Sequence, residues 1–143
     1  MGAEEIDLEE DARRYAIKVY LFDTCTLLWA INKPEHLSDP ARAIWRERDG
    51  MIAVSVINYW EIATKAEKHG IADIGKWWEH RVMPFVDLET IQVREEHVTE
   101  MLRLPKHHKD PFDRMLIAQA RVENMILVTP DKHIQAYDVS TVW

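Results

Sequence analysis

The chain has 143 residues, 47% of them hydrophobic and 30% charged, which is typical of one soluble globular domain with a buried core. Its formal net charge of −7 argues against a broad electrostatic grip on nucleic acid and leaves room only for a local basic patch. A single cysteine, Cys25, and the lack of any apolar run near the roughly 20 residues that span a bilayer favour a reducing cytoplasm over a secreted or membrane location.

Residues 1 to 17 form an acidic amino-terminal segment, with six acidic side chains against two arginines. This segment supplies −4 of the net charge and is unlike the basic start of a signal peptide. We expect a flexible, solvated extension there, followed by one nearly neutral domain over residues 18 to 143.

The first predicted elements are a buried strand over residues 19–23 and a helix over residues 24–31. The strand places Asp23 at its carboxyl end, which is where open α/β sheets bind ligands. A second helix is predicted over residues 38–50, followed by a second buried strand over residues 51–54.

The next predicted helix covers residues 56–69, opened by Ser55 and closed by Gly70, and it is apolar around most of its circumference. Glu61 lies among these apolar positions, although ionised glutamates are almost never fully buried without a partner. Glu61 therefore either meets a nearby Lys or Arg or faces a cation.

Residues 71–104 have a looser pattern. We predict a helix around Trp77 and Trp78, a possible strand over residues 85–88 and an amphipathic helix over residues 94–102. Two adjacent tryptophans can form an exposed partner-binding face, but the interpretation we favour is the core and rim of a helical hairpin.

The segment His108–Ala120 carries two carboxylates onto the first turn of a helix, with Asp110 as N-cap, Pro111 next and Asp113 in the third helical position. The helix should end near residues 123–124, and because it is apolar on nearly every side it belongs in the middle of the domain. Taken alone, such acids more often only cap a helix.

A further buried strand is predicted over residues 125–128 and leads to Asp131, again an acid beyond a strand's carboxyl end. A short helix over residues 134–137 and an edge strand over residues 139–143 follow. Strands that alternate with helices in this way predict a three-layer α/β fold, with a mostly parallel central sheet and helices on both faces.

Right-handed crossovers would bring the strand ends and the helix amino termini to one edge of the sheet, where isolated acids can converge. These acids are Asp23, Glu61, Asp113 and Asp131. Two like charges about 4 Å apart repel by about 4 kcal/mol at an effective dielectric constant of 20, so four cannot stay ionised without a counter-ion. Oxygen ligands suit Mg²⁺ or Mn²⁺, and such a metal site can hydrolyse phosphate esters by activating water.

Other polar residues near this edge have less specific assignments. The Thr24 hydroxyl either holds water or phosphate or caps a helix, and Asp110 is a second-tier ligand because it can simply cap its helix. His107 and His108 are expected at the surface near phosphate rather than on a metal. We predict phosphate contacts for the one local basic strip, namely Lys106, Lys109 and Arg114.

Four motifs in order carry a resemblance to a known family. They are Leu21–Trp29 with Asp23, Ser55–Lys65 with Glu61, Asp110–Ala120 with Asp113, and Leu127–Asp131. Over Tyr20 to Trp143 the chain resembles the PIN-domain ribonucleases, in particular the toxins of bacterial and archaeal VapBC-type toxin–antitoxin pairs.

The resemblance implies a PIN-like fold and a set of metal-binding acids, namely Asp23, Glu61, Asp113 and Asp131. It also implies Mg²⁺ or Mn²⁺ as cofactor, endonucleolytic cleavage of an RNA such as tRNA, rRNA or mRNA, neutralisation by a VapB-like antitoxin, and a homodimer. The sequence departs from the family pattern at Cys25, where close relatives commonly have His, at Pro130, where many have Arg, and in its acidic leader.

Two other function classes stay open. A phosphatase of the haloacid-dehalogenase type would use Asp23 as nucleophile, but its loop has a second Asp where Cys25 stands. A binding module without catalysis would keep the acids for structure and dock a partner on its tryptophan-rich helices. Metal-dependent cleavage of RNA separates the nuclease hypothesis from both.

Overall fold

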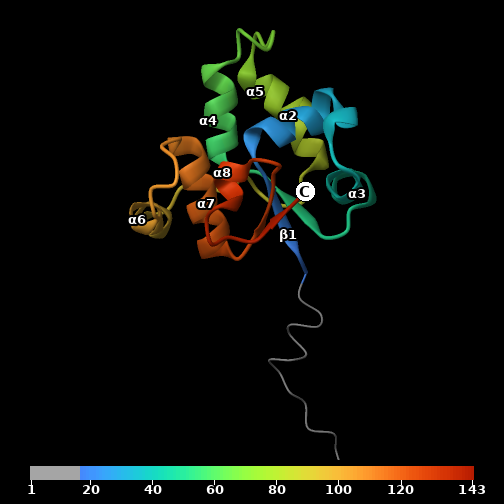
Figure 1. Cartoon of the computed structure of the whole chain (residues 1–143). Coiled ribbons are helices and arrows are strands. Elements are labelled where there is room, and N and C mark those ends of the chain that lie inside the picture. The colour runs from blue at the N-terminus through green and yellow to red at the C-terminus, as the bar shows by residue number, and fades with distance from the viewer. Residues whose placement is uncertain (1–16) are drawn as a thin grey trace, which may run out of the picture.

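The computed structural model describes residues 17–143, so the predicted acidic extension lies, apart from Ile17, outside the described residues. These residues form a four-stranded parallel sheet in the order β2-β1-β3-β4 (Figure 1). The strands are β1 Val19–Phe22, β2 Met51–Ala53, β3 Ile126–Val128 and β4 Thr141–Val142. Because all four strands are parallel, their carboxyl ends lie at one edge of the sheet.

The helices cover both faces of this sheet. They are α2 Thr24–Asn32, α3 Asp39–Glu47, α4 Val56–Thr64, α5 Ile74–Trp77, α6 Glu95–Arg103, α7 Pro111–Glu123 and α8 Lys132–Gln135, with the short turns η1 Pro34–His36, η2 Trp78–Val82 and η3 Met83–Phe85. None of the helices within residues 17–143 has the length and apolar character needed to cross a membrane.

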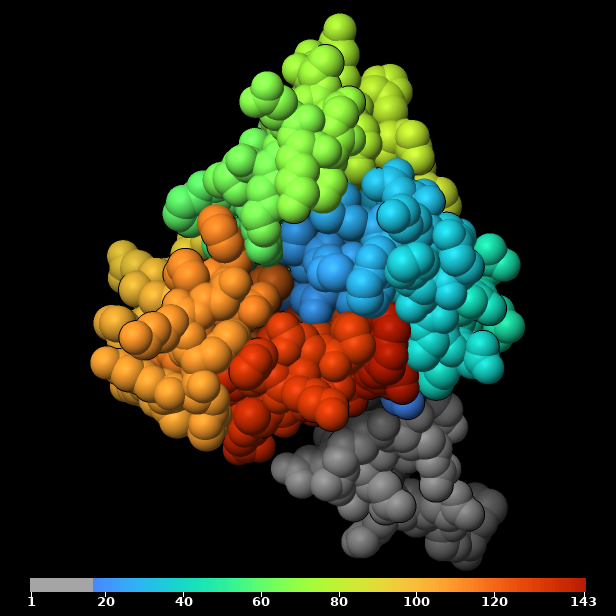
Figure 2. All heavy atoms as spheres, turned by 45° about the horizontal axis from the view of Figure 1, so that its top comes forward, coloured from blue at the N-terminus to red at the C-terminus, as the bar shows by residue number. Residues whose placement is uncertain are grey.

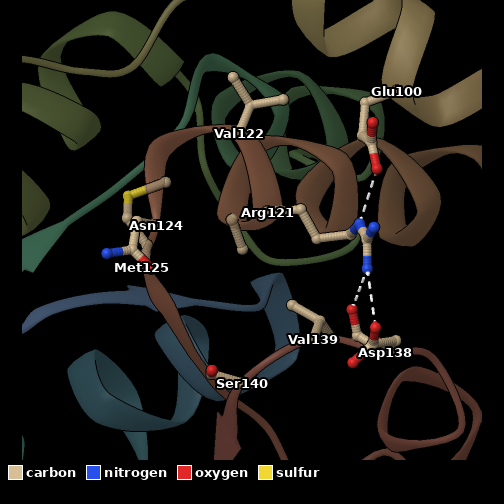
Figure 3. Close-up of a pocket in the computed structure, with 9 residues that line it drawn as sticks. Glu100, Arg121, Val122, Asn124, Met125, Asp138, Val139 and Ser140 are labelled. Carbon is tan, nitrogen blue, oxygen red and sulfur yellow. Dashed lines mark hydrogen bonds and ion pairs between the residues drawn. The ribbon is translucent and has the colours of Figure 1, made fainter.

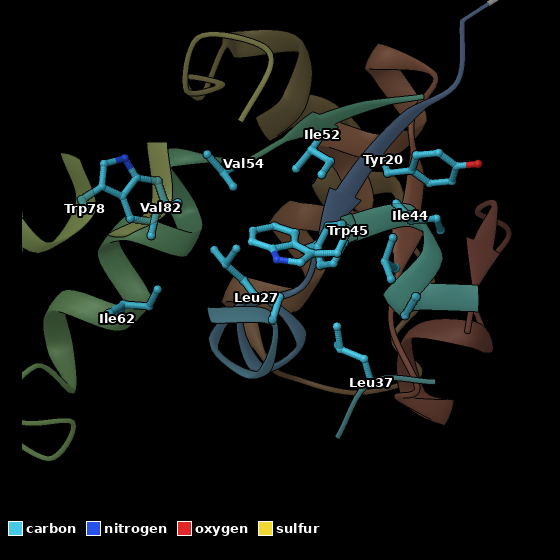
Figure 4. Close-up of a cluster of buried hydrophobic side chains, with 14 residues drawn as sticks. Tyr20, Leu27, Leu37, Ile44, Trp45, Ile52, Val54, Ile62, Trp78 and Val82 are labelled. Carbon is cyan, nitrogen blue, oxygen red and sulfur yellow. The ribbon is translucent and has the colours of Figure 1, made fainter. Parts of the chain in front are cut away.

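Successive residues of β1 point to opposite faces of the sheet and join two separate buried clusters. Phe22 packs edge-to-face on Trp45 of α3 in the cluster shown in Figure 4, whereas Leu21 belongs to the cluster that contains Leu116 of α7. Burial on both faces explains why the strands are continuous apolar runs in the sequence. The predicted three-layer α/β arrangement is confirmed.

Residues 85–88 do not form the strand that we predicted. The Asp87 carboxylate accepts the Ile52 N–H at 2.7 Å and contacts the Arg48 guanidinium at 2.5 Å, while the Asp87 N–H donates to the Ile52 carbonyl at 2.9 Å. A side chain thus occupies the place at the edge of β2 where a neighbouring strand would supply its backbone, so no ladder forms.

Two helices end earlier than predicted. The α3 helix stops at Glu47 because Arg48 adopts a left-handed conformation and the chain then turns at Gly50, where a Cβ atom would lie 2.6 Å from the Lys18 carbonyl oxygen. The α4 helix stops at Thr64, since residues 67–70 are exposed and no packing holds them helical. The two adjacent tryptophans form core and rim, as we expected: Trp78 is buried and Trp77 is half-buried.

Candidate active site

Asp23 lies directly beyond the end of β1 and is the N-cap of α2. The residue is 5% exposed, and its carboxylate accepts the Thr26 N–H at 2.8 Å through Oδ1 and the Thr129 hydroxyl through Oδ2. Burial raises the pKa of this carboxyl, although both hydrogen bonds oppose the shift. Asp23 is therefore fixed in orientation, and its negative charge lies in a poorly solvated place.

Thr129 joins Asp23 to Asp131 and was missed by sequence reasoning. Its buried hydroxyl donates to Asp23 and accepts the Asp131 N–H at 3.0 Å. Asp131 is in turn the N-cap of α8, where its Oδ1 accepts the His133 N–H at 2.8 Å. The available signal was a polar residue directly after a buried strand and just before an acid.

Glu61 meets a lysine, which is the first of the two alternatives that its position in the sequence left open. Its Oε2 lies 3.5 Å from the Lys65 ammonium, while its Oε1 is buried and has no hydrogen-bond partner among the described residues. The side chain is only 12% exposed. A buried carboxylate oxygen without a donor is costly unless a cation or water reaches it.

Asn58, also missed from the sequence, holds α4 against the first strand. It is the N3 residue of α4: its Oδ1 accepts the Ser55 N–H at 2.8 Å, and its Nδ2 donates to the Phe22 carbonyl and to Thr24 Oγ1, each at 3.1 Å. The Thr24 hydroxyl therefore belongs to this buried network. The capping alternative for Thr24 was wrong, because Asp23 is the N-cap of α2.

Asp110 and Asp113 occupy the positions predicted for them at the front of α7. Asp110 is the N-cap and accepts the Asp113 N–H at 3.0 Å, whereas the half-buried Asp113 carboxylate lies 3.2 Å from His108 Nε2. Burial is the largest of several causes that raise the pKa of Asp113 to about 7. The other causes are the charges of four further carboxylates, those of Asp110, Asp23, Glu61 and Asp131.

His108 is not the surface residue that we expected. Its Nδ1 lies 2.8 Å from the Tyr137 hydroxyl, and its ring stacks on that of His133 with centroids 5.7 Å apart. His107 is exposed and packs edge-on against Tyr137. His108 therefore forms one wall beside Asp113.

The Arg114 guanidinium donates within the protein through both of its Nη atoms. Its Nη1 donates to the Pro105 carbonyl at 2.8 Å and to the Tyr137 hydroxyl at 3.0 Å, and its Nη2 donates to the Met101 and Leu104 carbonyls. Arg114 thus satisfies carbonyls at the end of α6, which favours a structural role over the predicted phosphate contact. The other two residues predicted to contact phosphate, Lys106 and Lys109, are exposed.

The four elements that carry these acids meet at one face of the molecule. In Figure 2 the α2 segment, in blue, lies in the centre and is bordered by α4 in green, α7 in orange and the α8 segment in red. Cys25 is exposed on α2, and partial burial together with the carboxylates of Asp23, Glu61 and Asp131 raises the pKa of its thiol. Its side chain therefore borders the acids and stays protonated at neutral pH.

A separate surface hollow lies near the amino end of β3, away from the acids (Figure 3). Arg121 crosses it, donating to Glu100 Oε1 at 2.7 Å and to the Asp138 carbonyl oxygen. Because these charged groups neutralise one another, the hollow does not compete with the acidic edge as a candidate catalytic site.

The acidic edge is better suited to bind a hydrated divalent cation through a few carboxylates than to enclose a cation in a preformed cage of ligands. Within residues 17–143, no three His, Cys, Asp or Glu side chains are arranged to surround one ion. However, Mg²⁺ usually keeps several waters and binds through one or two carboxylates. Oε1 of Glu61 has no partner, and the pKa values of Asp23 and Asp113 are raised. Both features are expected of a site that lacks positive charge.

Fold and site together define an α/β protein with clustered carboxylates at the carboxyl edge of a parallel sheet, which suits phosphoester hydrolysis. The PIN domain family model matches residues 20–140, so the chain belongs to the PIN-domain family. This match confirms the family indicated by the four sequence motifs. It makes the chain a nuclease rather than a phosphatase of the haloacid-dehalogenase type.

Three solved structures with the same fold are described below, whereas the comparison with curated proteins found no match. VapBC2 from Rickettsia felis, bound to a promoter DNA fragment, matches with a TM-score of 0.62 at 18% identity. This match covers 87% of the present chain and 98% of the VapBC2 chain. FitAcB from Neisseria gonorrhoeae has a TM-score of 0.62 at 14% identity, with coverage of 87% and 96%. VapBC-5 from Mycobacterium tuberculosis has a TM-score of 0.54 at 18% identity, with coverage of 87% and 95%. At these identities the matches establish the fold.

Proposed function

We propose that the chain is a metal-dependent endoribonuclease and the toxin of a VapBC-type toxin–antitoxin pair. The observation that carries the proposal is Asp113, whose pKa of about 7 reflects burial together with the charges of carboxylates from three other segments. The toxin role is supported by the structural matches, since VapBC-5 is a member of the VapBC family of toxin–antitoxin systems. In this proposal the RNA substrate and a VapB-like antitoxin are the partners, a homodimer is the working form, and the cytoplasm is its location.

The residues that would hold Mg²⁺ or Mn²⁺ are Asp23, Glu61, Asp113 and Asp131. When bound, the cation supplies positive charge that lowers the pKa of the attacking water and neutralises charge on the phosphate. Asp23 is oriented before any ligand arrives, because Thr26 and Thr129 already bind its two oxygens. Asp113 changes from partly protonated to ionised as positive charge arrives.

Hydrolysis adds one water across a phosphodiester bond. The water oxygen bonds to phosphorus, the bond from phosphorus to one ribose oxygen breaks, and that oxygen leaves with a proton. Lys106 and Lys109, exposed on the segment that leads into α7, would contact neighbouring phosphates. Arg114 is left out of this set, because both of its Nη atoms donate within the protein.

The proposal is tested by incubating the purified protein with total tRNA and with a single-stranded RNA, with Mg²⁺, Mn²⁺ or EDTA. We expect cleavage only with a divalent ion and expect Asp23→Asn and Asp113→Asn to abolish it. Asp39→Asn, a fully exposed acid on α3, is the control and should cleave normally. Full activity in both site variants would reject the site.

The toxin role has its own test, which is expression in bacteria with and without the product of the adjoining reading frame. We expect the wild type to arrest growth and Asp113→Asn not to arrest it. Co-expression of a small antitoxin should relieve the arrest. A protein that neither cleaves RNA nor gains thermal stability from Mn²⁺ would instead favour the non-catalytic binding module.

A further inference from the structure

A pair of aromatic rings lies beside the acids and is not explained by the proposed reaction. Trp60 directly precedes Glu61 on α4, and Phe112 directly precedes Asp113 on α7. The two ring centroids are 5.1 Å apart, with their planes at 87°. This edge-to-face contact therefore joins the two helices that bring Glu61 and Asp113 to the site.

Trp60 is unusual among the six tryptophans of the chain. It is 58% exposed, whereas the others are buried or half-buried, as in the case of Trp45 and Trp78 at 6% and 7%. Edge-to-face pairing holds an aromatic ring in a set orientation. Trp60 is thus a ring held by Phe112 that keeps most of its apolar surface accessible to a ligand.

The charges around Trp60 favour RNA over protein as that ligand. Lys65, the C-cap of α4, has a side chain that is 54% exposed and whose ammonium lies 3.5 Å from Glu61, and Lys109 is exposed just before α7. The exposed residues that follow Trp60 along the chain are mostly polar, among them Thr64, Glu67 and Lys68. Proteins that bind single strands combine basic side chains with aromatic rings on which bases stack.

We propose that Trp60, supported by Phe112, is the platform on which one nucleobase of the substrate RNA stacks, next to the phosphate held at the acids. This inference rests on the proposed ribonuclease function and specifies its substrate as unpaired RNA, because only an unpaired base is free to stack on a side chain. Trp60 is then a specificity-determining residue that acts through binding.

The binding experiment uses the Asp113→Asn protein, in which RNA is not cleaved, and measures the anisotropy of a labelled single-stranded oligonucleotide. Adding Trp60→Leu should weaken binding about five-fold or more, whereas adding Trp60→Phe should retain most of the affinity. Phe85→Leu removes another exposed aromatic residue, one that stacks on Trp45, and should change nothing. An abasic oligonucleotide of the same length should bind all these variants equally, because it has no base to stack.

Two further readouts separate stacking from a structural role. RNA should quench the tryptophan emission of the Asp113→Asn protein, and the quenching should be smaller with Trp60→Phe. In the otherwise wild-type enzyme, Trp60→Leu should raise KM for single-stranded RNA more than it lowers kcat, while the loss of one aromatic contact lowers the melting temperature by only a few degrees.

Failure of this inference is distinct from failure of the ribonuclease function. If the wild type cleaves RNA and Trp60→Leu neither weakens binding nor raises KM, the platform is rejected while the nuclease stands. If the same variant instead weakens self-association or antitoxin binding, Trp60 belongs to a protein interface. If the wild type does not cleave RNA at all, both proposals fail.

Discussion

The most informative single residue is Asp113, because folding raises its pKa from 3.8 to about 7. Between these two pH values the folded protein binds more protons at this carboxyl than the unfolded chain does. The free energy of unfolding therefore falls as pH rises through this window and stays low above it. Ionised Asp113 is a cost that the acidic site imposes on the fold.

Replacing Asp113 with Asn should remove that cost. In EDTA at pH 8 we expect Asp113→Asn to be more stable than the wild type by about 1–2 kcal/mol, a figure reduced to allow for partial solvent exposure of the carboxyl. At pH 4 the two proteins should be equally stable. Urea unfolding at both pH values measures this, with Asp39→Asn as the exposed-acid control. A variant less stable than the wild type at pH 8 would contradict the assigned pKa.

Replacing Thr129 should reduce RNA cleavage by more than it reduces the stability of the fold. Thr129→Val removes the hydroxyl that donates to Asp23 and accepts from the Asp131 N–H, so both acids lose a fixed orientation. We expect a loss of about 1–3 kcal/mol in the free energy of unfolding, since buried polar groups are left unpaired. RNA cleavage should fall further than this instability explains, and Thr129→Ser should restore it. Normal cleavage by the folded Thr129→Val protein would show that the bridge is dispensable.

At the scale of whole elements, Arg114 ties the end of α6 to α7 and to the chain after α8. Its planar fork reaches carbonyls of Met101, Leu104 and Pro105 as well as the Tyr137 hydroxyl. Arg114→Lys cannot make this set of bonds, and we expect it to cost about 1–3 kcal/mol in unfolding free energy. Its RNA affinity should keep the wild-type salt dependence.

Lys109→Gln is the matching test for a phosphate contact. Because Lys109 is exposed, the substitution should leave stability unchanged while it reduces the salt dependence of RNA binding. The reverse pattern, a stable Arg114→Lys protein with a smaller salt slope, would restore Arg114 to the phosphate contacts.

Most elements could be predicted from local sequence because their causes are local. The caps at Ser55 and Asp110 and the apolar strand runs each act within a few residues of themselves. The strand predicted over residues 85–88 was wrong because a distant contact determines the conformation there. The Asp87 carboxylate binds the backbone of Ile52, 35 positions earlier. A short apolar pattern cannot show that a side chain will replace a strand's backbone.

At the scale of the whole molecule, the residues of the candidate site also differ in whether local sequence could identify them. Asp23, Glu61 and Asp131 could be singled out because each is an acid at the end of an apolar strand or within an apolar helix. Thr129 could not, because its function depends on Asp23, which is 106 residues away in the sequence. Parallel strand order brings such partners together, and only the folded sheet shows which ones meet.

The proposed site should also make metal affinity, and with it the stability of the whole domain, depend on pH. Because a bound cation displaces the proton that Asp113 holds below pH 7, apparent metal affinity should rise up to about ten-fold per pH unit towards pH 7. A ligand at 100 times its dissociation constant adds roughly 2.7 kcal/mol of stability, and a tenfold weaker affinity removes about half of that.

Thermal unfolding with and without Mn²⁺ at pH 6 and pH 8 measures this coupling. The rise in Tm on adding Mn²⁺ should be larger at pH 8, by roughly 4 °C for each kcal/mol of added stabilisation. Asp113→Asn should lose both the rise and its pH dependence, whereas Asp39→Asn should behave as the wild type. An equal rise at both pH values would mean that the ion binds without displacing the Asp113 proton, and the metal would then have to be held by the other acids.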